Sequence, residues 1–97
     1  MRRAISPAHP ISSTRFSGLA VDPTRGHLYA VSTNGFEDSA KTARRNAVVL
    51  YDLKTGRLLD RFAAPEAMQL NDLALAPDGT LYVTDSMSST LFRKKPG

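Results

Sequence analysis

The sequence has 97 residues, 41% hydrophobic and 23% charged, which suffices for one small packed domain and not for two. It contains no cysteine, and this excludes disulfides, thiolate metal sites and a cysteine nucleophile. Thirteen Lys and Arg residues against nine Asp and Glu give a formal net charge of +4, a balance that permits contacts with acidic surfaces.

The distribution of the basic residues argues against a nucleic-acid site. They form small groups at 2–3, 44–45 and 93–95, in predicted turns or ends, with no aromatic residues interleaved. We therefore expect no nucleic-acid partner. No apolar run approaches a membrane span, and none follows the basic start, so we expect no membrane partner, transmembrane segment or signal peptide. Localisation is otherwise unknown, and cytoplasmic is the default expectation.

The first half of the chain reads as short strands separated by polar turns. In chain order the pattern predicts an irregular leader over residues 1–15, strands over 16–21 and 27–32, and a polar excursion loop over 34–46. The turn over 22–26, which contains Pro and Gly, makes the two strands an antiparallel hairpin. Within the polar loop, Asp38 or Ser39 could cap a single helical turn.

The strongest strand signal lies over residues 47–53. These residues are apolar on both faces, so we expect the strand to be covered on both sides. A tight turn over 54–56 leads to a fourth, more exposed strand over 57–62. Residues 63–69 carry Pro65 and good helix formers, so a short helix there is an open alternative.

The opening pattern then recurs. Residues 71–85 match residues 17–32 with one extra turn residue in the first copy, and the identical pairs are Leu19/Leu73, Ala20/Ala74, Pro23/Pro77, Gly26/Gly79, Leu28/Leu81 and Tyr29/Tyr82. In the third strand we match Leu50-Tyr51 with Leu91-Phe92. Repeats of about 40–50 residues with four short strands each are typical of propeller blades, because stacking covers both faces of each small sheet.

The repeat predicts an all-β fold of about two antiparallel four-stranded propeller blades, the second incomplete. The predicted organisation is a leader over 1–15, a first blade over 16–64 with its polar loop at 34–46, and a second blade over 65–97. That blade has three strands before Pro96-Gly97, where a fourth should begin. A small β-sandwich of about seven strands is the alternative.

Two segments carry a resemblance to known families. Gly18-Leu19-Ala20-Val21-Asp22-Pro23 with Gly26-His27-Leu28-Tyr29 is similar to NHL-type repeats. The run Leu70-Asn71-Asp72-Leu73-Ala74-Leu75-Ala76-Pro77-Asp78-Gly79 and its continuation to Ser86 resembles the gluconolactonase / regucalcin-like (senescence marker protein) family, as do residues 48–56. The resemblance covers residues 16–97 and implies part of a six-bladed β-propeller. The chain is then a truncated copy or one that self-associates through open blade faces.

The resemblance also implies an activity. In the intact family fold a divalent cation (Ca, Zn, Mg or Mn) activates water for lactone hydrolysis, and the substrate is a small-molecule lactone or sugar acid. Asn71 falls where the family motif places a pocket-facing Asn, and it forms with Asp72 the predicted substrate-binding pair. Because side chains alternate along a strand, only one of the two can face the channel, and Asp72 is expected to tie down the loop.

Departures from the family pattern put catalysis by this chain in question. Ser17 stands where the resemblance places a ligating Glu, Leu73 stands for the motif's Gly, and the other family ligands belong to later blades. We therefore predict no metal ligand in this chain, leave the catalytic residues unknown, and expect the chain to be inactive alone. An NHL-like interaction module without catalysis is the alternative. In related propellers the Asp at the place of Asp85 hydrogen-bonds backbone near the blade turns, so the resemblance implies a structural role for Asp85, and His27 is expected to be a surface histidine.

Overall fold

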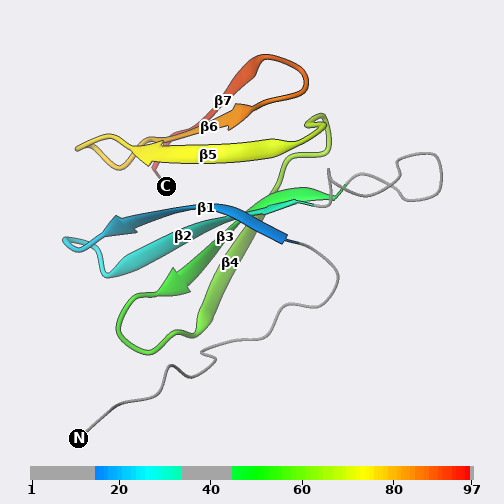
Figure 1. Cartoon of the computed structure of the whole chain (residues 1–97). Helices are drawn as coiled ribbons and strands as arrows, with labels where there is room; N and C mark the ends of the chain where they lie inside the picture. The colour runs from blue at the N-terminus through cyan, green and yellow to red at the C-terminus, as the bar shows by residue number, and fades with distance from the viewer. Residues whose placement is uncertain (1–14, 34–44, 97) are drawn as a thin grey trace, which may run out of the picture.

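The structure is a computed structural model that describes residues 15–33 and 45–96, and it is all-β there. Seven strands form two antiparallel sheets, and no helix occurs in the described ranges. The strands are β1 (Arg15–Asp22), β2 (His27–Thr33), β3 (Asn46–Asp52), β4 (Leu58–Ala63), β5 (Leu70–Leu75), β6 (Leu81–Asp85) and β7 (Thr90–Lys94). The first sheet has the order β1-β2-β3-β4 and the second β5-β6-β7, and Figure 1 shows them as two layers.

The predicted hairpin turns are confirmed. β1 pairs with β2, β3 with β4, and β5 with β6, each across a turn that contains one glycine. Gly26 and Gly79, which the repeat places at equivalent positions, both adopt a positive φ, of 70° and 93°. A residue with a Cβ is strained in that region, so both copies of the repeat use glycine for the same conformational reason.

The third strand is covered on both sides, as its sequence predicts. Every residue from Asn46 to Tyr51 is buried, whereas β4 is exposed along most of its length. The strand begins at Asn46, one residue earlier than predicted. The sequence interpretation assigned Asn46 to the polar loop, but its side chain is buried. The rest of that loop, including Asp38 and Ser39, and the leader before Arg15 lie outside the described residues.

Two details of the sequence interpretation are wrong. No helix forms over 63–69: these residues form a bent connection in which the amide of Ala67 donates to the carbonyl of Ala64. The match of Leu50 with Leu91 is also displaced. Tyr29 pairs with Leu50, whereas its equivalent Tyr82 pairs with Arg93, so the counterpart of Leu50 is Arg93. Leu91, two residues earlier in β7, is therefore the counterpart of Val48.

The two sheets pack front to back. We call front the face that carries Ala20, Tyr29 and Val31 in the first sheet, and back the face that carries Leu19, Val21, Leu28 and Ala30. The front of the first sheet packs on Leu73, Leu75, Leu81 and Val83 of the second, which are the repeat equivalents of the back residues. The two sheets, which have equivalent sequences, therefore stack in the same orientation: the front of the first sheet contacts the back of the second.

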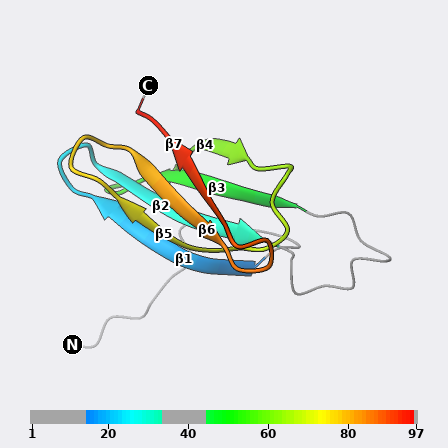
Figure 2. The ribbon, with the colours of Figure 1, turned by 90° about the horizontal axis from the view of Figure 1, so that it is seen from above.

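The stacking is closest at one side of the molecule. The backbone of β5 approaches β1 and β2, and the view from above in Figure 2 places β5 over β1. The sheets separate toward β4 and β7. On the front of the second sheet Leu91 is 62% exposed, whereas its counterpart Val48 is 5% exposed, so that face has no covering layer in the described residues.

Candidate functional site

The predicted pair Asn71 and Asp72 lies in a β-bulge on β5. Leu70 pairs with Asp85 and Leu73 with Val83, so the two residues together oppose the single residue Thr84. The amide of Asp72 donates to Thr84 Oγ1 at 3.2 Å, and Asp72 Oδ1 accepts the amide of Leu73 at 2.8 Å. Both side chains are exposed. The strict alternation assumed from the sequence is therefore interrupted at this pair.

The start of β1 meets this bulge directly. The Ser17 hydroxyl donates to the carbonyl of Leu70 at 3.1 Å. A Cβ built on Gly18 would lie 3.0 Å from the carbonyl oxygen of Asn71 and 3.1 Å from Asp72 Oδ1. The structure thus brings the predicted pair Asn71 and Asp72 beside Ser17, which stands where the resemblance places a ligating Glu, and glycine permits this close approach of β1 and β5.

Replacing Gly18 with alanine is expected to lower the free energy of unfolding by about 1–2 kcal/mol, because the new Cβ overlaps backbone of β5. Valine at the same position should cost more, since its branched side chain is larger. Urea unfolding followed by circular dichroism measures both. Equal stability of all three proteins would show that β1 and β5 do not approach this closely.

The residues at this junction do not fit a metal centre. Asp72 is the one carboxylate among Ser17, Asn71 and Asp72, its Oδ1 already accepts an amide, and the Ser17 hydroxyl donates to a carbonyl. A hard divalent cation prefers several oxygen ligands, usually with more than one carboxylate. Within residues 15–33 and 45–96, no group of three or more His, Asp or Glu side chains is placed to hold a metal ion.

Arg25 connects the turns of the two repeats. Its Nη1 pairs with Asp22 Oδ2 at 2.8 Å, and its Nη2 donates to the carbonyl of Asp78 at 3.2 Å. The hydrogen bond from Arg25 lowers the pKa of the Asp22 carboxyl below its usual value, and Asp22 in turn raises the pKa of Arg25. A Cβ on Gly79 would lie 3.1 Å from the guanidinium carbon. The ion pair holds the Arg25 side chain within its own turn, and the hydrogen bond to Asp78 links that turn to the turn of the second repeat.

Asp85 is a structural carboxylate, as predicted. It is 2% exposed, and it accepts the amides of Met68 (2.6 Å), Gln69 (3.1 Å), Met87 (3.0 Å) and Ser88 (3.1 Å). Burial alone would raise its pKa, but the backbone hydrogen bonds outweigh burial and lower the pKa to about 2. The carboxylate thereby joins the connection before β5 to the turn after β6.

Asn46 is the buried polar residue that the sequence interpretation missed. It is 3% exposed, and its Oδ1 accepts the Thr33 hydroxyl at 2.6 Å and the amide of Leu70 at 3.0 Å. Its Nδ2 donates to the carbonyls of Ala67 at 2.9 Å and Met68 at 3.4 Å. The only signal in the sequence was its position directly before an apolar strand.

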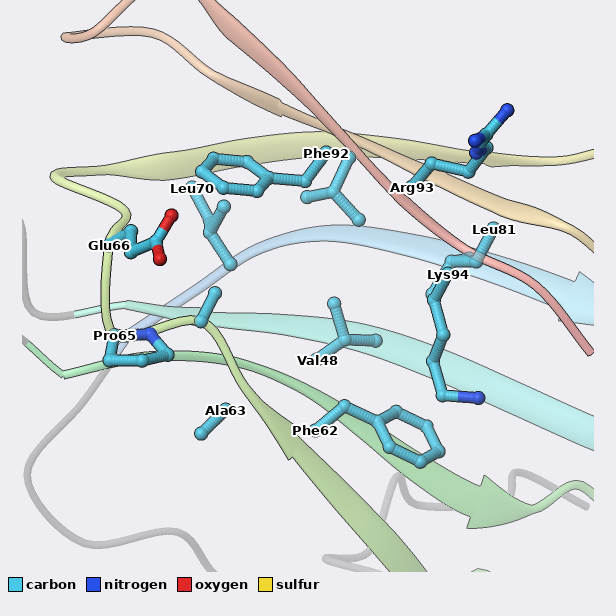
Figure 3. A pocket seen from close by; sticks show the side chains of 12 residues that line it. Val48, Phe62, Ala63, Pro65, Glu66, Leu70, Leu81, Phe92, Arg93 and Lys94 are labelled. Atoms are coloured by element: carbon cyan, nitrogen blue, oxygen red, sulfur yellow. The ribbon is translucent and has the colours of Figure 1, made fainter. Parts of the chain in front are cut away.

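An apolar cavity lies away from the predicted pair, in the wedge between the sheets. It has a volume of about 410 Å³ and runs between β4 and β7. Figure 3 shows apolar side chains, among them Val48, Phe62, Leu81 and Phe92, between Glu66 at one end and Lys94 at the other. Lys94 Nζ lies 4.3 Å from the centroid of the Phe62 ring, so a side chain of β7 reaches across the wedge to β4.

A second cavity, of about 280 Å³, continues past Lys94 toward His27. His27 is half-buried rather than fully at the surface. Its ring packs edge-on against Tyr29 with 6.0 Å between centroids, and its Nδ1 is buried with no hydrogen-bond partner among the described residues. Asn71 and Asp72 line neither of these cavities, nor a third cavity of about 270 Å³ beside the β1–β2 turn.

In the described ranges, no helix is long and apolar enough to cross a membrane. The fold and these sites were compared with known proteins in three ways. A scan against protein-family models, a search of curated proteins and a search of solved structures each gave no match.

Proposed function

We propose that this chain is part of a β-propeller of gluconolactonase-like descent that does not hydrolyse lactones by itself. The observation that carries the proposal is the front-to-back stacking of two sheets with equivalent sequences. Successive propeller blades must stack in one orientation around an axis, whereas a sandwich of two sheets has no such requirement. The exposed front of the second sheet is then the surface for a further blade, supplied by self-association or by another chain.

The chemistry of the junction supports the absence of catalysis by the isolated chain. The exposed Asn71 and Asp72 are placed to contact a substrate only if neighbouring blades build a pocket over them. In an assembled form the substrate would be a lactone or sugar acid, and the divalent cation would need carboxylates from outside the described residues. The proposal therefore assigns substrate contact, and no metal ligation, to this pair.

The proposal predicts that the purified chain shows no lactone hydrolysis above the background of Ca²⁺, Zn²⁺ or Mn²⁺ in buffer, because the donor set is incomplete. Light scattering during size-exclusion chromatography measures assembly on the same sample, and an oligomer is the expected result. Turnover that is lost in Asn71→Ala and kept in the control Thr24→Ala, an exposed turn variant, would contradict inactivity. A monomer that melts cooperatively would contradict the need for further blades.

A second candidate function is the binding of another polypeptide without catalysis. It is favoured by the edge of β7, which has no partner strand within residues 15–33 and 45–96, and by the mainly apolar cavity beside it, because both features are suited to an extended peptide. This candidate does not require descent from an enzyme.

A further inference from the structure

The outer edge of β7 has no strand beside it in the described part of the chain. β7 pairs with β6 alone, whereas the equivalent strand of the first sheet, β3, pairs with both β2 and β4. Along such an edge, backbone N–H and C=O groups point away from the sheet and can pair with an added strand. The position that β4 fills in the first sheet is thus open in the second.

The 410 Å³ cavity lies directly beside this open position. Phe92 and Lys94 line it from β7, and Phe62 lines it from β4. In a strand added next to β7, every second side chain would point to the back of the second sheet and so into the cavity. The wall there is formed by Val48, Phe62, Leu81, Val83 and Phe92, so apolar side chains of moderate size fit this space.

The charges along the edge indicate the other side chains of the added strand. Arg93, Lys94 and Lys95 follow one another at the end of β7. Arg93 is exposed and belongs to the front face, since it pairs with Tyr82. Opposite charges on neighbouring strands attract, so the residue beside Arg93 should be acidic.

We propose that the edge of β7 binds an extended peptide as a fourth strand, with apolar side chains in the cavity and acidic side chains on the front face. The inference rests on the second proposed function, polypeptide binding, and assigns it a site and a partner class. Backbone pairing gives a strand of this kind its affinity, and the alternating pockets give it specificity.

The same observations favour an acidic partner over a second copy of this chain. A second copy that offered its own β7 edge would bring the same basic run, so the two edges would repel. The edge of β4 is less suited to strand addition. The amide of Arg61 there already donates to Asp60 Oδ1 at 2.7 Å, and its exposed charges alternate in sign.

The test uses a labelled peptide in which valine alternates with glutamate, titrated against the whole chain by fluorescence anisotropy. Saturable binding is expected, and a valine–lysine peptide and a proline-substituted peptide should not bind. Arg93→Glu should weaken binding about fivefold to tenfold. The matched control Lys54→Glu makes the same charge change in the exposed β3–β4 turn, away from the cavities, and should change it less than about twofold. Circular dichroism verifies that both variants fold.

Hydrogen exchange locates the bound strand. At a peptide concentration ten times the Kd, outward amides of Thr90–Lys94 should exchange about tenfold more slowly, while those of Leu58–Ala63 should be unchanged. Binding without protection of β7, or equal loss of affinity in both charge variants, overturns the site but leaves polypeptide binding standing. No binding of the acidic peptide overturns both. Protection of β7 that rises with protein concentration alone would assign the edge to a second copy and overturn the proposal.

Discussion

Replacing Asp85 with alanine is expected to lower the free energy of unfolding by about 3 kcal/mol, one of the two largest effects expected for this chain. The carboxylate is buried and accepts four backbone amides, from Met68, Gln69, Met87 and Ser88. The substitution removes the acceptor that these four amides share. In a domain of this size each kcal/mol lowers Tm by roughly 4–8 °C. Thermal and urea unfolding both measure the loss.

The same carboxylate makes stability depend on acid. Its folded-state pKa is about 2, below the ordinary value of 3.8, because the amides favour the charged form. The difference corresponds to roughly 2 kcal/mol of stability, which is fully present above about pH 5 and is lost as the pH falls toward 2. The pKa values of Asp22, Asp52 and Asp78 are also lowered, so they change stability in the same direction.

Two variants serve as controls for Asp85. Asp85→Asn keeps one acceptor oxygen and removes the charge. We therefore expect the free energy of unfolding to fall by roughly 2 kcal/mol and to depend less on pH. Asp60→Ala removes an exposed carboxylate from β4 and should change stability by less than about 0.5 kcal/mol. If Asp85→Ala and Asp60→Ala unfold at the same urea concentration, the four hydrogen bonds contribute nothing measurable.

Asn46→Ala should cost about 2–4 kcal/mol. The substitution removes both functions of the amide: the acceptor for Thr33 and the amide of Leu70, and the donor to the carbonyls of Ala67 and Met68. Asn46 is the side chain through which the first sheet holds the connection that enters β5. Its removal should therefore increase hydrogen exchange over residues 67–70 before the sheets themselves unfold.

The chain offers a matched asparagine for comparison. Asn71 is exposed on β5, so Asn71→Ala should change the free energy of unfolding by less than about 0.5 kcal/mol. The pair also separates structure from function, because Asn71 is the residue with a proposed substrate contact. A large loss of stability in Asn71→Ala would contradict its exposed position, and no loss in Asn46→Ala would contradict the structural role of its hydrogen bonds.

Much of the fold follows from local pattern. Neighbouring residues alone determine the alternation in β1 and β2, the apolar run of β3 and the glycine turns. The sequence therefore predicts most strand ends to within about one residue. The structural role of Asp85 was predicted from the resemblance to propeller repeats, in which an Asp at this place hydrogen-bonds backbone near the blade turns. The two-sheet arrangement follows from the internal repeat.

What the sequence could not predict depends on contacts between distant residues. The bulge at Asn71 and Asp72 has no local signal, since it results from the pairing of Leu70 with Asp85 and of Leu73 with Val83. The register of β7 was misjudged because Leu91-Phe92 resembles Leu50-Tyr51 in type but pairs two residues away. The burial of Asn46 depends on the segment 67–70, about twenty residues further along the chain.

The front-to-back stacking gives the molecule a direction. Its two outer faces differ from each other, so a contact that joined the front of one copy to the back of the next would be heterologous rather than twofold, and such a stack would lengthen end to end. Duplicating the gene segment for one sheet would lengthen such a stack without a new interface, because each added unit repeats a contact that already exists. A substitution on one outer face would stop the addition of copies at that end of the stack, and the opposite end could still bind another copy.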